Sequence, residues 1–177
     1  APGEPRRHRG CGGYTLDVAT GQFSSRATGR LAIDPGVVVK LQNSRIELER
    51  GASQLIAEGD EFNPVIFTSL GDNRYGAGGT FDTNGNLPDI RAAGDWGGIV
   101  LNAGTRASID QAYIGFGGGL TPIEGTSDSF NVIEVHQGDL RLANTRVEHN
   151  LSGEAGSDRT GRGTNAAATV FVRGGQP

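Results

Sequence analysis

The segment 82–89 carries side chains suited to holding a metal ion, in the order Asp-Thr-Asn-Gly-Asn-Leu-Pro-Asp. Its oxygen donors recur at nearly alternate positions around a glycine: Asp82, Asn84, Asn86 and Asp89. Hard oxygen ligands at such spacing are typical of calcium-binding loops. The segment lacks the glutamate that closes an EF-hand loop, and an Asn-Gly turn with solvated carboxylates also accounts for it. Calcium is therefore a candidate cofactor that would order this loop.

A second set of residues could bind or cleave a glycan. These charged and aromatic side chains lie in or beside three long stretches without strand patterning: Asp72, Arg74, Tyr75, Asp95, Glu124, Asp128, Asp158 and Arg159. Hydrolysis of a glycosidic bond needs two carboxyl groups, roughly 5 to 9.5 Å apart. Carboxylates that converge in a groove would indicate an enzyme, whereas carboxylates splayed in water would indicate a binding or structural surface.

The other chemistry-bearing residues do not form a catalytic set. Six carboxylates lie in strand-like runs: Glu47, Glu58, Asp110, Glu134, Asp139 and Glu148. Alignment of these runs places no two of them opposite each other. We interpret His136 and His149 as solvated side chains, and Lys40, the only lysine, as an outward surface residue. No Ser-His-acid motif and no phosphate-binding glycine loop occurs.

Composition and charge exclude several function classes. The chain has 16 basic and 20 acidic residues, a net charge of −4, and no basic stripe with interleaved aromatic residues, so we expect no nucleic-acid partner. Cys11 is the only cysteine, which excludes an internal disulfide and a zinc site built from thiolates. No run of 18 apolar residues predicts a membrane span. The lack of any Met favours a piece of a larger, exported protein.

Short β-branched runs at 37–39, 46–48, 55–57 and 65–67 form the framework that must position these residues. Glycine accounts for 30 of the 177 residues and only 35% of residues are hydrophobic, so the core must be narrow and the turns many. The runs are short strands at even spacing, and their turns are too open for hairpins. This pattern predicts a chain that winds and stacks parallel strands.

Later runs repeat the first ones in phase. If the first three runs are the three sides of one coil, Ile66 stands above Val38, and the runs at 96–101, 107–109 and 112–116 continue the second, third and first sides. The next coil then gives four further stacked pairs: 130–135 above 96–101, Leu142 above Ile109, Val147 above Ile114, and 169–173 above 130–135. Matches on several sides at once indicate a regular solenoid.

This phasing brings the long stretches together. The stretches 70–95, 117–129 and 150–167 all fall between the first and second sides, so they should stack on one edge of the cylinder. Loops gathered on a rigid scaffold are where binding and catalysis usually occur. Trp96 and Phe130 fall at one phase in this alignment, and we interpret them as stacked structural aromatics.

Several segments carry a family resemblance. They are Leu-x-Ile-x-Pro-Gly-Val at 31–37, Gln-Leu-Ile-Ala-Glu-Gly at 54–59, Asn-Pro-Val-Ile-Phe-Thr-Ser at 63–69, Asp-Trp-Gly-Gly-Ile at 95–99, and Ala-Ser-Ile-Asp-x-Ala-x-Ile at 107–114. Over about residues 30–175 the chain resembles the pectate-lyase-like, right-handed parallel β-helix segments of large bacterial secreted and cell-surface proteins. Proteins of that kind range from polysaccharide lyases and hydrolases to adhesins. The Asn-Thr-Asp, Asp-Asp and Gly-His-Gly signals of the galacturonan hydrolases are absent here.

We therefore expect an all-β chain folded as a right-handed parallel β-helix, a solenoid of about four to five coils with long loops gathered on one edge. Residues 1–30, rich in Gly, Pro and Arg, should form a mobile leader whose one strand-like run, 14–18, caps the core. Residues 31–177 should form the β-helix. Because 170–172 begins a coil that is not finished, we expect that end to be covered by the rest of a longer chain or by a self-association partner.

The favoured function is a non-catalytic structural or binding module of a secreted or bacterial cell-surface protein. Its loop edge, formed by 70–95, 117–129 and 150–167, would be presented to a glycan or a protein. The alternative is a polysaccharide lyase or hydrolase with its site on the same edge. The expected partner is accordingly a polysaccharide or a surface protein.

Overall fold

The computed structural model describes residues 14–17, 22–25, 29–75, 89–123, 125–153 and 168–174. Every regular element in these ranges is a β-strand. The strands form three four-stranded parallel sheets and two antiparallel hairpins. The hairpins are β1 (Tyr14–Asp17) with β2 (Gln22–Ser25), and β11 (Gly119–Ile123) with β12 (Thr126–Phe130). A search of the described residues for a helix that could cross a membrane finds none.

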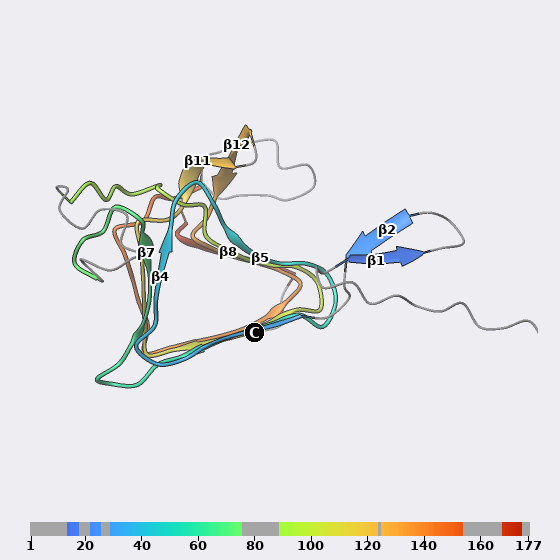
Figure 1. The fold of residues 1–177 in the computed structure, drawn as a ribbon, viewed down its shortest axis with the longest axis horizontal. Helices are drawn as coiled ribbons and strands as arrows, with labels where there is room; N and C mark the ends of the chain where they lie inside the picture. Colours follow the sequence, from blue (N-terminus) through green and yellow to red (C-terminus); the bar gives the residue numbers. More distant parts are fainter. Residues whose placement is uncertain are drawn as a thin grey trace, which may run out of the picture.

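The three parallel sheets form the three sides of a triangle when the molecule is viewed end on (Figure 1). The first sheet contains β15 (Arg146–Glu148), β10 (Ala112–Gly115), β7 (Val65–Ser69) and β4 (Val38–Leu41) in spatial order. The second contains β16 (Val170–Arg173), β13 (Ile133–His136), β8 (Ile99–Leu101) and β5 (Ile46–Leu48). The third contains β14 (Asp139–Ala143), β9 (Arg106–Asp110), β6 (Gln54–Glu58) and β3 (Arg30–Ile33).

The strand register confirms the apolar stacking that the sequence predicts, with one correction. Glu58 of β6 pairs with Asp110 of β9, so two of the strand carboxylates do lie opposite each other, where the sequence alignment predicted no such pair. The predicted pairs found in the sheets are Val38 with Ile66, Ile99 with Ile133, Ile133 with Val170, Ile109 with Leu142, and Ile114 with Val147. A slip of one residue would turn every inward side chain outward. The apolar alternation of the runs is therefore sufficient to specify these pairings.

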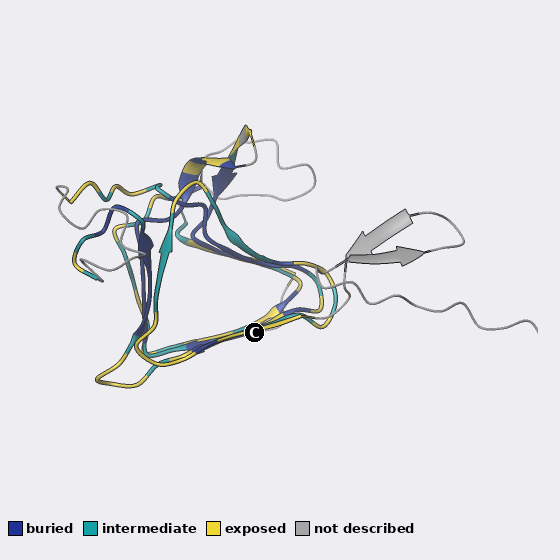
Figure 2. Ribbon diagram, viewed as in Figure 1, coloured by how far each residue is buried: buried dark blue, intermediate teal, exposed yellow. Residues whose placement is uncertain are grey.

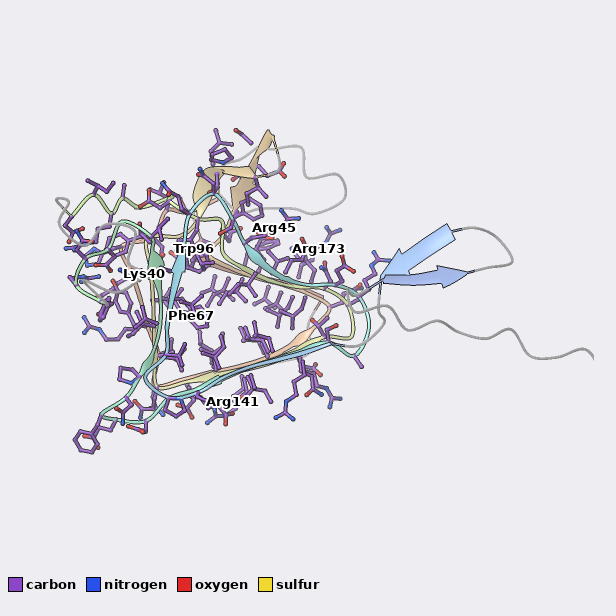
Figure 3. The ribbon with its side chains drawn as sticks, in the orientation of Figure 1. Lys40, Arg45, Phe67, Trp96, Arg141 and Arg173 are labelled. Atoms are coloured by element: carbon purple, nitrogen blue, oxygen red, sulfur yellow. The ribbon has the colours of Figure 1, made fainter. Side chains whose placement is uncertain are left out.

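The main apolar core lies inside the triangle, where the three sheets face one another. On β8, Ile99 and Leu101 belong to this core, whereas Val100 belongs to a different cluster, as expected when side chains alternate between the two faces of a strand. Figure 3 shows Phe67 of β7 pointing into the same interior. Ile66, its neighbour on β7, is also buried, and Figure 2 shows β7 buried along its length. The centre of the first sheet is therefore covered on its outer face as well, whereas β4 and β15 at its edges are less buried.

The hairpin β11–β12 covers the outer face of the second sheet (Figure 1). Ile123 and Phe130 of the hairpin pack on Val100 of β8 and form a small second core. The expectation that 117–129 is irregular was wrong. Its few apolar residues contact only the outside of one sheet, so they leave a weak alternation in the sequence.

Trp96 and Phe130 are both structural, but they do not stack on each other at the same position of successive coils. Trp96 is buried in the main core, and its indole Nε1 donates a hydrogen bond to the Gly115 carbonyl at 2.9 Å. Phe130 packs instead in the outer cluster with Val100. The stacking prediction was wrong because Phe130 ends β12 and does not begin β13.

The three long stretches leave the triangle at one edge, between the first and second sheets, as predicted. They connect β7 to β8, β10 to β13, and β15 to β16. Their described ends are joined by backbone hydrogen bonds, from Gly94 N to Phe116 O at 3.1 Å and from Leu151 N to Gly117 O at 2.8 Å. Segments 76–88 and 154–167 lie outside the described residues.

The two ends of the described chain bear on two further predictions. In the leader, β1 pairs with a second strand, β2, where the sequence predicted a single strand at 14–18. The capping role of the leader stays a prediction. At the other end, Val172 pairs with the core residue Val135 but is 58% exposed, so apolar surface is open on β16. What covers that surface also stays a prediction.

Candidate functional site

A buried carboxylate lies where the chain leaves β7. The side chain of Asp72 has no exposed surface, and its Oδ2 accepts a hydrogen bond at 2.6 Å from Oγ1 of Thr68, the penultimate residue of β7. Arg74, two residues further on, binds the same carboxylate. Its backbone N, Nε and Nη2 donate hydrogen bonds to the two Asp72 oxygens at 3.1, 3.0 and 2.9 Å. A bidentate arginine–carboxylate pair of this kind is among the stronger polar contacts in proteins.

The far arm of the same loop returns to this carboxylate. Arg91 Nη1 lies 3.3 Å from Asp72 Oδ1, and the same guanidinium is ion-paired with Asp89. A backbone hydrogen bond from Ile90 N to Gly71 O, at 3.2 Å, joins the two arms beside the ion pairs. Asp72 therefore fixes residues 71–74 and 89–91 to one point on the first sheet.

The charge state of this group follows from its contacts. Burial by itself would raise the pKa of Asp72, but the hydrogen bonds from Arg74 and Thr68 outweigh burial and lower the pKa to about 2. The same contact with Asp72 raises the pKa of Arg74 above its usual range. Asp72 is thus a permanent anion at neutral pH and cannot serve as a proton donor.

Aromatic rings surround the Arg74 guanidinium. Its central carbon lies 5.2 Å from the ring centroid of Tyr75, 5.5 Å from that of Tyr113 and 5.3 Å from that of Phe116. These distances are within the range of cation–π attraction. Nη2 of Arg74 also donates a hydrogen bond to the Tyr113 hydroxyl at 3.1 Å. The rings and the carboxylate together hold the guanidinium in one orientation.

Phe116 extends this arrangement toward the surface. The Arg91 guanidinium lies 5.4 Å from its ring centroid, and the His149 ring stacks on it with centroids 5.6 Å apart and planes 9° apart. The His149 side chain is 60% exposed. We define the Asp72 cluster as these seven residues: Asp72, Arg74, Tyr75, Arg91, Tyr113, Phe116 and His149. It presents two guanidinium groups and an exposed aromatic ring at the loop edge.

Asp95 is held close to the cluster but outside it. Its Oδ2 accepts hydrogen bonds from Ser69 Oγ at 2.5 Å and from the Ala92 backbone N at 2.8 Å. Ser69 follows Thr68 in the chain, so Asp95 anchors the end of the same loop. The carboxyl groups of Asp60, Asp72 and Asp110 all have a lowered pKa, through the hydrogen bonds that each accepts. A general acid would need the opposite shift.

The sequence identified part of this site. Asp72, Arg74 and Tyr75 come together, and Asp95 lies beside them. Asp128 is on β12, opposite Thr121 in the hairpin over the second sheet. Glu124, Asp158 and Arg159 lie outside the described residues, as do the metal candidates Asp82, Asn84 and Asn86.

The fourth metal candidate, Asp89, is ion-paired with Arg91. The described ranges contain no group of three or more His, Cys, Asp or Glu residues that could hold a metal ion. Three of the four proposed ligands are not in those ranges. Calcium therefore stays a prediction for the segment 82–89.

Sequence reasoning missed four members of the cluster. Tyr113 and Phe116 lie in or next to β10, and Tyr113 pairs with Ile66, on the face opposite the core residue Ile114. Strand alternation could have placed Tyr113 on the outer face. Arg91 lies in the loop between β7 and β8, His149 directly follows β15, and neither carries a motif of its own.

Two interpretations of single residues need correction. Lys40 is outward as predicted, in register with Thr68, but it is half-buried and its ammonium nitrogen is buried, so it is not a fully exposed surface residue. His136 is only 11% exposed and lies 3.0 Å from Oε2 of the buried Glu134, so it is not a solvated side chain.

Comparison with protein-family models, with curated proteins and with solved structures gives no match.

Proposed function

We propose that the chain is a right-handed parallel β-helix of the pectate-lyase-like kind. Support comes from the three stacks of four parallel strands, which the chain enters one after another, and from the apolar core between them. Crossover connections between parallel strands are almost always right-handed. A stack of this kind is rigid and carries its loops on a fixed edge, as a binding module requires.

On this scaffold, the Asp72 cluster binds an acidic polysaccharide without cleaving it. The observation that carries this proposal is the pair of arginines, Arg74 and Arg91, held by one buried carboxylate beside stacked aromatic rings. Guanidinium groups fixed in this way match the carboxylates of uronic acids, and the exposed His149 ring offers a flat surface to a sugar. Such polymers occur outside the cell, which agrees with a secreted or bacterial cell-surface location.

The low pKa of Asp72 supports binding over hydrolysis. A hydrolase on this edge would need a carboxyl group that can hold a proton near neutral pH, or a carboxylate nucleophile free to attack. Asp72 is committed to two arginines and a threonine. The net charge of −4 does not oppose binding at the cluster, because distant surface charges are screened beyond roughly 8 Å at physiological salt.

Titration calorimetry with polygalacturonate, and with dextran as a neutral polymer, tests this function. We expect binding of polygalacturonate only, weakened by added salt, and weakened at least ten-fold by Arg91→Gln. His149→Ala should also weaken binding without loss of stability, since that side chain is exposed and its role here is ring stacking. The control is Arg141→Gln on the third sheet, which should bind normally. Equal binding of both polymers, or cleavage of polygalacturonate, would contradict the proposal.

A further inference from the structure

A second cationic site lies at another corner of the triangle, between the second and third sheets. The turns that follow β5, β8, β13 and β16 stack there, one above the next. Backbone hydrogen bonds join them: Gly51 N to Ala103 O at 3.1 Å, Gly104 N to Gln137 O at 3.1 Å, and Gln137 N to Arg173 O at 2.9 Å. The strand register thus continues into the corner and fixes the side chains that emerge from it.

A cavity of about 230 Å³ opens on this corner. Its lining residues are Arg50, Asn102, Ala103, His136, Gln137, Arg173 and Gly174. Two of them carry guanidinium groups, and none is an aspartate or a glutamate. Figure 3 shows Arg173 at the end of the second sheet, far from Lys40 and the first sheet. We call this space the corner cavity.

The walls of the corner cavity are held in place by contacts outside it. Asn102 is buried, and its Nδ2 donates to Leu48 O and to Glu47 Oε1, both at 2.9 Å. His136 lies 3.0 Å from Glu134 Oε2 and packs edge-on against Phe171, with centroids 5.9 Å apart. These two side chains therefore give the cavity a fixed shape.

The nearby carboxylates are already engaged. Glu47 accepts a hydrogen bond from Arg45 Nε at 2.7 Å as well as the one from Asn102. Glu134 accepts one from the Asn131 backbone N at 2.8 Å and faces His136. Neither carboxylate lines the cavity, so the described side chains that face a ligand there are cationic or neutral.

We propose that the corner cavity binds a tetrahedral oxyanion, sulfate or phosphate, between Arg50 and Arg173. Planar guanidinium forks bind such oxygens in pairs, and the Gln137 amide adds a neutral donor. The volume is far above the roughly 30 Å³ of one water and below the roughly 300 Å³ at which pockets for drug-sized ligands begin. A small ion or a single charged substituent of a polymer fits this range. The site is separate from the Asp72 cluster and does not depend on its function.

The test is an NMR titration of the whole chain with sodium sulfate, sodium phosphate and sodium chloride at matched ionic strength. Sulfate and phosphate should shift the backbone amides of 102–104, 136–138 and 173–174, whereas chloride should not. Arg50→Gln and Arg173→Gln should each weaken sulfate binding at least ten-fold. Arg50→Lys should retain part of it, because the charge remains. The control Arg141→Gln, on the outer face of the third sheet (Figure 3), should bind as the unmodified chain does.

A second arm separates the possible sources of the oxyanion. Dextran sulfate that binds more tightly than inorganic sulfate, and loses that advantage in Arg173→Gln, would identify a sulfated polymer as the ligand. Equal affinity per sulfate would identify the free ion. Arg141→Gln should leave both affinities unchanged, and shifts at 102–104, 136–138 and 173–174 distinguish this site from the Asp72 cluster. Sulfate shifts no larger than those of chloride, or normal sulfate binding in both glutamine variants, would overturn the proposal.

Discussion

Asp72 is the residue on which the candidate site depends, because both arms of one long loop end at its carboxylate. Replacing it with asparagine keeps its shape but removes the carboxylate that pairs with Arg74 and leaves Arg91 with Asp89 alone. We expect Asp72→Asn to lower the free energy of unfolding by about 2–3 kcal/mol, the range for a hydrogen bond to a charged, buried group. Urea denaturation measures this loss. The matched control is Asp139→Asn, whose ion pair with Arg106 is exposed and should contribute little.

The same residue makes stability depend on pH. The pKa of Asp72 is about 2 in the folded chain and near 3.8 when unperturbed, so its stabilisation is fully present above about pH 5 and is lost as pH falls from about 4 to 2. The unmodified chain should therefore lose about 2 kcal/mol more than Asp72→Asn between pH 6 and pH 2. Parallel stability curves for the two proteins would show that Asp72 is not the titrating group.

At this scale the sequence predicts some residues and misses others for a physical reason. Asp72, Arg74 and Tyr75 lie in a loop, where charged and aromatic side chains attract a functional interpretation. Phe116 and His149 lie beside strands, where the same side chains are explained by packing or by solvent. Their role appears only when the first sheet is stacked and its outer face is covered.

At the scale of elements, the parallel strands are predictable and the hairpin β11–β12 is not. The inward side chains of neighbouring circuits are alike, as Ile109 and Leu142 are, so several pairs of residues in the sequence specify the same strand register. The hairpin occurs once and pairs with itself. Its burial depends on Val100, a residue that alternation alone assigns to the solvent face.

The hairpin should nevertheless contribute strongly to stability. Phe130 is 1% exposed and packs on Val100 and Ile123, so Phe130→Ala should cost about 3 kcal/mol through lost burial and a cavity. Leu120, on the other face of the same hairpin, is exposed, and Leu120→Ala should cost less than about 1 kcal/mol. Chemical denaturation of both variants gives the comparison. Equal losses would mean that the hairpin does not dock on the second sheet.

At the scale of the whole molecule, stability should vary along the stack. In a stack of repeats each circuit contacts only its neighbours, so an inner circuit has two partners and an outer one has a single partner. Ile109 of β9 and Leu142 of β14 occupy the same position in successive circuits, but Ile109 is fully buried and Leu142 is 37% exposed. Comparing the two residues therefore tests the effect of position along the stack, because both occupy the same place within their own circuit.

We expect Ile109→Ala to lower the free energy of unfolding by about 3 kcal/mol, and Leu142→Ala by about 1 kcal/mol or less. Hydrogen exchange should agree, with slow amide exchange in β8, β9 and β10 and faster exchange in β14 and β16. The two measurements address different alternatives. Equal costs for the two variants would place Leu142 under a cover, as the expectation of a partner at this end requires. Uniform slow exchange across all strands would indicate one cooperative core in place of a stack of separable circuits.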